Sequence, residues 1–166
     1  MKAILFVYTI IYGANNFICT CIPMSVGDNV KKSSFIFTGT VLKINTVMIT
    51  DEDIPKNAFR IRYLATLKVK EVFKGQRTND TMHIITGEGM SDCGYFFESS
   101  KDYLIYAKEE KYAVIDTLEI VDAKYPSHEM NYLTTTICDR TTPTVKKERK
   151  LLRYYLSKSK SIRSSQ

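Results

Sequence analysis

The sequence predicts a mainly β fold, a small barrel or sandwich rather than an α/β protein. Short segments rich in β-branched and aromatic residues recur along the chain at even spacing, with turn residues between them. The longest of these segments alternates apolar with charged residues, which is the period of a half-buried strand. A length of 166 residues, of which 44% are hydrophobic, is typical of one compact domain with a real core.

The individual strands are predicted from the same signals. Phe35–Ile44 is the first, and a charged loop over residues 45–57 follows it. Phe59–Phe73 is the longest; its apolar positions, such as Leu67 and Val69, alternate with lysines and arginines. Residues 112–123 are compatible with a strand or a hairpin. The other predicted strands are Thr81–Thr86, Lys101–Glu110 and Asn131–Cys138.

The C-terminal part of the chain has a helical pattern instead. Thr144 is a candidate cap, and the following apolar residues fall near one helical face: Val145, Leu151, Leu152, Tyr155 and Leu156. Residues 157–166 are mostly serine and basic residues, so we expect a basic disordered tail there.

The N-terminal residues 1–18 resemble a secretory signal peptide. Lys2 precedes a ten-residue apolar run, Ala3–Tyr12, which is too short to cross a bilayer, since crossing takes about 20 residues. No later segment is apolar enough to span a membrane, so we expect a secreted, extracellular protein. The cleavage site stays open, because Ala14 suits signal peptidase better than Ile18 does.

Export bears on the four cysteines, Cys19, Cys21, Cys93 and Cys138. Thiols outside the cytosol usually form disulfides, and four cysteines allow three connectivities. A Cys19–Cys21 bridge would close a very small, strained ring, so we expect each of these two residues to pair with a distant partner. A resident zinc site is not expected, since only two histidines are present and no second close-spaced cysteine pair exists.

Charge is distributed unevenly. Residues 139–166 contain nine basic and two acidic residues, a net charge of +7, whereas the chain as a whole carries +6. The basic character therefore belongs to the C-terminal segment, and a sulfated matrix glycan such as heparan sulfate is a candidate partner for it. Nucleic acid is not expected as a partner of an exported chain. No H-E-x-x-H, G-x-S-x-G or P-loop motif occurs, so an enzyme is not expected either.

An ordered set of motifs points to one family. "CTCIP" begins at Cys19, "DCGYF" begins at Asp92, and "TTTIC" ends at Cys138. Together they resemble the N-terminal, netrin-like domain of the tissue inhibitors of metalloproteinases, here as a single-domain member over residues 19–156. The resemblance implies a five-stranded OB-type Greek-key barrel with flanking helices, including the basic C-terminal one. It also implies the pairings Cys19–Cys93 and Cys21–Cys138.

The resemblance further implies a mechanism. In such inhibitors the first mature residue, here Cys19, chelates the zinc of the target protease through its α-amino nitrogen and carbonyl oxygen. The zinc belongs to the protease, and the inhibitor has no cofactor of its own. Thr20 would enter the specificity pocket of a secreted zinc metalloproteinase. The implied inhibitory edge comprises Cys19, Thr20, Cys21, Ile22, Pro23, Ser91, Asp92 and Cys93.

The chain also departs from the family. It has no cysteines for the third disulfide of the inhibitory domain, and Asp92 brings a negative charge to the implied edge. The alternative function is therefore a netrin-like extracellular module without inhibitory activity, which binds matrix glycans or a partner protein. Asn79 heads an Asn-Asp-Thr sequon in a predicted turn and is a candidate glycosylation site.

Overall fold

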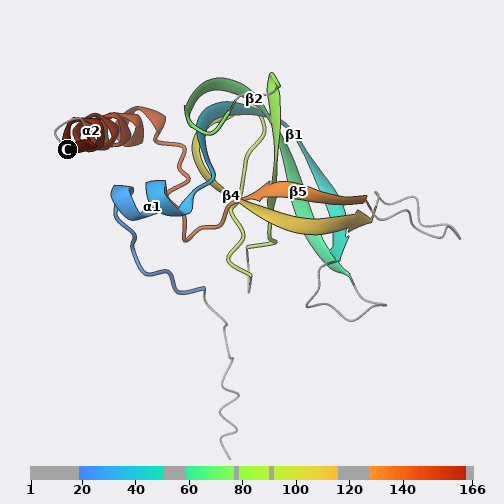
Figure 1. Ribbon diagram of the computed structural model, residues 1–166. Coiled ribbons are helices and arrows are strands. Elements are labelled where there is room, and N and C mark those ends of the chain that lie inside the picture. Colours follow the sequence, from blue (N-terminus) through green and yellow to red (C-terminus); the bar gives the residue numbers. More distant parts are fainter. Residues whose placement is uncertain (1–18, 51–58, 77–78, 90–91, 116–127, 164–166) are drawn as a thin grey trace, which may run out of the picture.

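Five strands form a closed barrel in the computed structural model, which describes residues 19–50, 59–76, 79–89, 92–115 and 128–163. The order around the barrel is β1-β2-β3-β5-β4, with β3 parallel to β5, and the pairing of β1 with β4 closes the barrel (Figure 1). This is the order of an OB-type Greek-key barrel, so the predicted fold class is confirmed. The strands are β1 Phe35–Thr50, β2 Arg60–Lys74, β3 Thr81–Thr86, β4 Asp102–Ile115 and β5 His128–Thr134.

Strand ends differ from the prediction more than strand positions do. β1 continues through the expected loop as far as Thr50, because this extension pairs with the first half of β2. β4 extends to Ile115, while the last strand stops at Thr134, short of the predicted end at Cys138. The rest of the expected loop, 51–57, and residues 116–123 lie outside the described residues.

The alternation in β2 is confirmed only in its second half. Leu67 and Val69 lie in the barrel core, and the lysines between and after them are exposed. Phe59 and Ile61, the apolar positions of the same alternation at the start of the segment, are exposed. The pairing explains this difference, because β3 joins β2 only from Tyr63 onward and the start of β2 has β1 as its neighbour.

The first half of β4, Tyr103–Ala107, is apolar without alternation because both of its faces are covered. Tyr103 and Ile105 point into the barrel core with Phe37 of β1. Leu104 and Tyr106 point outward and pack beneath the two helices. A strand that is buried on both faces requires a continuous apolar run, which is what the sequence shows at "YLIYA".

The first helix, α1 Val26–Lys32, was not predicted. Ser25 caps it: the Ser25 Oγ accepts a hydrogen bond from the Asp28 backbone N–H at 3.1 Å and donates one to the Asp28 carboxylate at 2.6 Å. The S-x-x-D spacing of a capping box was the available signal. Both helices lie on the same side of the barrel (Figure 1).

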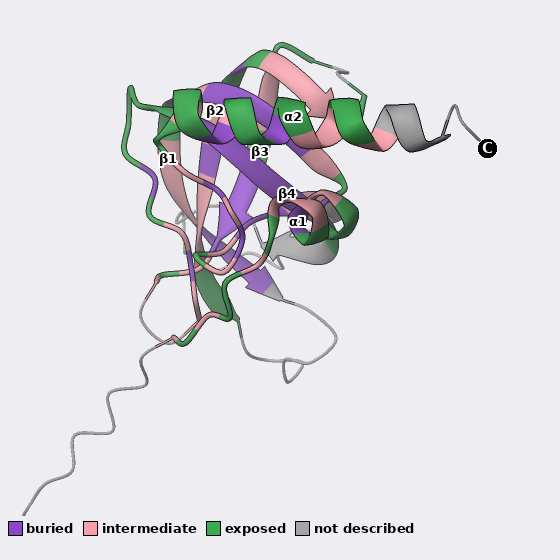
Figure 2. Ribbon diagram, turned by 90° about the vertical axis from the view of Figure 1, so that its left-hand side faces the viewer, coloured by how far each residue is buried: buried purple, intermediate pink, exposed green. Residues whose placement is uncertain are grey.

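The second helix, α2 Val145–Arg163, begins directly after Thr144, as predicted, but continues well past residue 156. Residues 157–163 are therefore helical, and the expected disordered tail does not begin there. Leu152 is fully buried against the barrel, whereas Leu151, predicted for the same face, is 42% exposed. Figure 2 shows α2 across the outside of the barrel, with its outer surface exposed. Within the described residues, no helix is long and apolar enough to cross a membrane.

Candidate functional site

The segment before α1 is attached to the barrel by two disulfides. Cys19 is bonded to Cys93, and Cys21 to Cys138, with Cα–Cα distances of 5.4 and 5.0 Å. These pairings are the ones that the family resemblance implies. The bonds join residues 74 and 117 positions apart in the sequence, so this short segment is tied to two remote parts of the chain.

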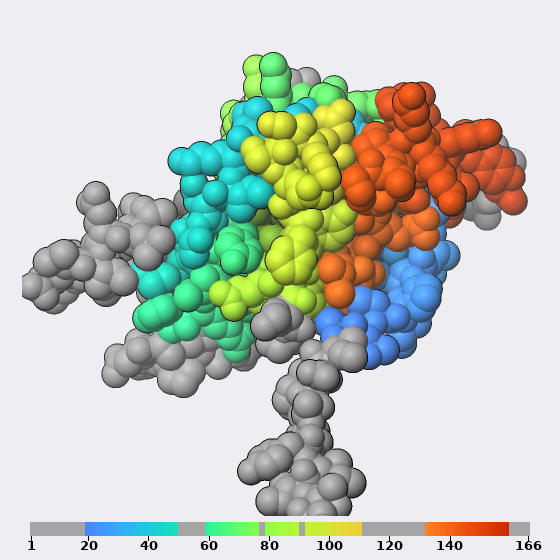
Figure 3. Space-filling model, turned by 180° about the vertical axis from the view of Figure 1, so that it is seen from behind, coloured from blue at the N-terminus to red at the C-terminus, as the bar shows by residue number. Residues whose placement is uncertain are grey.

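The two cysteines that hold the N-terminal segment, Cys93 and Cys138, lie on neighbouring stretches of backbone. The Ile137 backbone N–H donates to the Cys93 carbonyl oxygen at 2.9 Å, and Gly94 forms an isolated bridge with Thr136. The "DCGYF" and "TTTIC" motifs are therefore neighbouring backbone segments. Figure 3 shows the N-terminal segment, in blue, beside the orange segment that contains Cys138.

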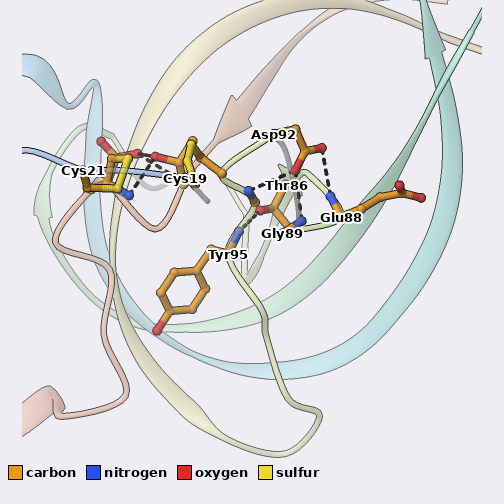
Figure 4. The surroundings of a disulfide bond; sticks show 12 residues. Cys19, Cys21, Thr86, Glu88, Gly89, Asp92 and Tyr95 are labelled. Carbon is orange, nitrogen blue, oxygen red and sulfur yellow. Dashed lines mark hydrogen bonds between the residues drawn. A yellow bond between two sulfur atoms is a disulfide. The ribbon is translucent and has the colours of Figure 1, made fainter. Parts of the chain in front are cut away.

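The close approach of these segments depends on glycine at position 94. A Cβ atom at that position would collide with the backbone of Gly87, which is not free to move aside. The Thr86 Oγ1 accepts a hydrogen bond from the Tyr95 backbone N–H at 2.6 Å, so the ends of the turn are held together (Figure 4). Cys93 has a φ of 56°, a left-handed conformation that non-glycine residues seldom adopt.

The Asp92 carboxylate organises the same turn. It accepts hydrogen bonds from the backbone N–H groups of Glu88, Gly89 and Gly94 at 2.9 to 3.1 Å (Figure 4). It also pairs with the Arg62 guanidinium of β2 at 2.8 Å. Partial burial by itself raises the pKa of the Asp92 carboxyl, but the three backbone hydrogen bonds and the charge of Arg62 outweigh it and hold that pKa below its ordinary value.

Asp92 therefore does not present an isolated negative charge to a partner. Its side chain is only 22% exposed, and its oxygens already accept four donors. Sequence reasoning missed Arg62, which the strand alternation placed on the solvent face of β2, although its side chain is only 16% exposed. No sequence signal indicated the pairing of Arg62 with Asp92, because the two residues lie 30 positions apart.

The residues between and after the two N-terminal cysteines face outward. Thr20 and Pro23 are exposed, and Ile22 is 84% exposed. Cys19 and Cys21 themselves are partly buried. Ser91, the remaining residue of the implied edge, lies outside the described residues. Thr20, Ile22 and Pro23 thus form an exposed ridge on a covalently fixed base.

The cysteine sulfurs also form the single group of potential metal ligands found among the described residues. The sulfurs of Cys19, Cys21 and Cys138 lie within 4.8 Å of one another. All three belong to disulfides, however, and metal ions in proteins are bound by the thiolate form. The cluster is therefore the meeting point of the two bridges.

Comparison with known proteins identifies the family to which this architecture belongs. The family description "Tissue inhibitor of metalloproteinase" matches residues 18–125. The chain belongs to the tissue inhibitor of metalloproteinase family. A search of curated proteins finds no match. Membership of the family implies an inhibitor of metalloproteinases rather than an enzyme, and a secreted protein.

Two further predicted features lie away from the inhibitory edge. Asn79 is exposed in the turn between β2 and β3. On α2, Lys147, Lys150 and Lys158 are exposed and lie on one helical face together with Leu151 and Tyr154. These five residues form what we call the outer face of α2.

Proposed function

We propose that this secreted protein inhibits zinc metalloproteinases by placing the α-amino nitrogen and the carbonyl oxygen of Cys19 on the catalytic zinc. The observation that carries the proposal is the exposed ridge of Thr20, Ile22 and Pro23, which two disulfides fix beside the Asp92 turn. Thr20 then enters the specificity pocket, and the Asp92–Cys93 turn lies beside it.

The chemistry suits a catalytic zinc ion, which keeps one coordination position open for water or substrate. An α-amino group has a pKa of about 8, so its neutral form, which carries the lone pair, is accessible at physiological pH. Joining residue 18 to Cys19 would turn this amine into an amide, whose nitrogen is not a ligand. Inhibition by this mechanism therefore requires that the chain be processed to begin at Cys19.

The fixed base of the ridge matters for affinity. A flexible segment loses conformational freedom when it binds, at about 0.5–1.5 kcal/mol for each side chain that is immobilised. Here the bridges of Cys19 and Cys21 and the internal contacts of Asp92 order the edge beforehand. More of the contact energy then remains as binding free energy.

The test compares two forms of the protein that differ only at the N-terminus, one beginning at Cys19 and one beginning at Phe17. N-terminal mass spectrometry verifies each form, and inhibition of a matrix-type metalloproteinase is titrated. We expect the extended form to be weaker by at least about 100-fold, equivalent to about 2.8 kcal/mol. Equal inhibition by both forms would contradict chelation, and no inhibition by either would favour the non-inhibitory module.

A second function is supported by the outer face of α2. Its three lysines are exposed, and residues 139–166 carry a net charge of +7. A sulfated glycan is a linear polyanion, so we propose that this face binds heparan sulfate or a related matrix glycan through screened Coulomb attraction. Such binding is independent of zinc chelation and would persist in a non-inhibitory module.

Heparin retention tests the glycan proposal. The triple variant Lys147→Gln, Lys150→Gln, Lys158→Gln should leave a heparin column at clearly lower salt than the wild type. The matched control removes three exposed lysines elsewhere: Lys31→Gln, Lys43→Gln, Lys68→Gln. Equal losses in the two triple variants would show a response to net charge alone, and the assignment to α2 would be wrong.

A further inference from the structure

The residues after Cys138 contact the chain directly after the inhibitory edge, at Met24 and Asn29. This stretch lies beyond residue 125, where the family match ends. Its central residue is Arg140, two positions after the cysteine that holds Cys21. The inference drawn from it rests on the proposed inhibitory function.

Arg140 makes two contacts with the N-terminal region. Its Nη1 donates a hydrogen bond to the carbonyl oxygen of Met24 at 3.2 Å. Its backbone N–H donates to the Oδ1 of Asn29, a buried residue of α1, also at 3.2 Å. The Asn29 side chain in turn donates to the Ser25 carbonyl oxygen at 3.3 Å. Arg140 thus contacts both the end of the ridge segment and the helix that follows it.

The guanidinium of Arg140 is itself held in a fixed orientation. Its Nε and Nη2 donate to the two carboxylate oxygens of Glu148, each at 2.7 Å. The Glu148 side chain is 7% exposed, and its Oε1 also accepts a hydrogen bond from the hydroxyl of Tyr106 at 2.9 Å. Tyr106 is a fully buried residue of β4. The chain of contacts therefore runs from the barrel, through α2, to Met24.

This arrangement fixes the ridge at both ends. The disulfide to Cys138 holds Cys21, and the Arg140 guanidinium holds the carbonyl of Met24. Ile22 and Pro23 span the interval between these two attachments. The disulfide acts at Cys21, whereas the guanidinium acts on the backbone of Met24, where the ridge meets α1.

We propose that Arg140 is a positioning residue for inhibition, which orients the Cys19–Pro23 edge before the protease binds. It does not touch the protease or its zinc. A planar guanidinium can donate to a carboxylate in a bidentate manner and still donate to a third acceptor, whereas a lysine ammonium acts as a point charge on a flexible stem. The role therefore depends on the geometry of arginine as well as on its charge.

The decisive variant is Arg140→Lys in the full protein beginning at Cys19. We expect inhibition to weaken by about 10-fold, the loss that ordering one or two extra groups on binding produces. Amide hydrogen exchange should accelerate at Cys21–Ser25. The matched control is Arg153→Lys, because Arg153, on α2, also pairs with a carboxylate, that of Glu71, but among the described residues has no hydrogen bond to the N-terminal segment. The control should change neither measurement.

A second variant covers the case in which Arg140→Lys does not fold. Glu148→Gln keeps an acceptor for one donor of Arg140 but removes the bidentate charged pair, so we expect about a 3-fold loss of inhibition together with faster exchange at Cys21–Ser25. Unchanged exchange in either folded variant overturns the positioning role, even if the protein inhibits. If the wild type does not inhibit, the chelation proposal fails separately, while exchange still decides whether Arg140 orders the edge.

Discussion

The N-terminal segment and the C-terminal helix are both attached to the outside of the barrel, but by different kinds of bond. The N-terminal segment is held by two disulfides, which neither pH nor salt weakens directly. α2 is held by the buried Leu152 and by ion pairs, including those from Arg149 and Arg153 to Glu71. The segment that we propose as the protease-binding edge is thus fixed covalently, whereas the basic helix is fixed by packing and charge.

The comparison also shows where the two kinds of attachment meet. Cys138 carries a disulfide to the N-terminal segment, and the residues directly after it begin the charged contacts. The Asp139 carboxylate, 2% exposed, pairs with Lys108 of β4 at 2.9 Å and accepts a hydrogen bond from the Thr136 backbone N–H. Asp139 and Arg140 therefore anchor this junction to the barrel on one side and to α1 on the other.

Removing one covalent attachment should have the largest effect. The double variant Cys21→Ser, Cys138→Ser opens a bond between residues 117 positions apart. The chain-entropy account predicts a loss of about 5 kcal/mol in the free energy of unfolding, measured by denaturant titration. The Cys19→Ser, Cys93→Ser variant, with a separation of 74, should lose slightly less. An unchanged denaturation midpoint in both variants would show that other contacts hold the segment.

Gly94→Ala tests the backbone contact beneath the disulfides. The new methyl group meets the Gly87 backbone, so the turn must open, and we expect a loss of about 1–3 kcal/mol. Gly27→Ala is the control, because its methyl group meets the side chain of Tyr155, which can rotate, and alanine favours the helix. Thermal unfolding of both variants checks this. Equal destabilisation of the two variants would contradict the special role of position 94.

The sequence predicted the barrel better than the site. Repeated apolar strands require a closed β core, and motif order identified the family and implied both disulfides. The charged contacts were missed because they depend on which residues the fold brings together. Arg62 and Asp92 lie 30 positions apart, and Arg140 reaches Glu148 from outside the helix, eight positions away, so no helical spacing signals the pair. The extent of α2 was missed because its last turns are polar.

Acid should weaken the Asp92 turn. The pKa of the Asp92 carboxyl is lower in the folded protein than its ordinary value of 3.8, so the charged form stabilises the fold. This contribution is complete above the ordinary value and is lost as the pH falls through the folded pKa. Asp92→Asn should therefore be less stable by about 1–2 kcal/mol at pH 7, and the difference should shrink below about pH 4.

Chemical denaturation of both proteins between pH 2 and pH 7 measures that difference. Asp102→Asn is the matched control: the Asp102 side chain is half exposed and pairs with an equally exposed Lys70. Exposed pairs contribute about 0–1 kcal/mol, so its effect at pH 7 should be smaller. A difference between the wild type and Asp92→Asn that does not depend on pH would mean that the carboxylate charge is not what stabilises the turn.

The smallest effect on stability is expected at the exposed ion pairs between α2 and Glu71. Glu71→Gln removes the carboxylate that pairs with Arg149 and Arg153, whose side chains are 36% and 60% exposed. Exposed ion pairs are weak and are screened by salt, so we expect a loss of about 0.5 kcal/mol at low salt and almost none at 1 M salt. Thermal unfolding at both salt concentrations measures it. Because Leu152 stays buried, α2 should remain docked. A large, salt-independent loss would show instead that Glu71 is essential to how α2 packs on the barrel.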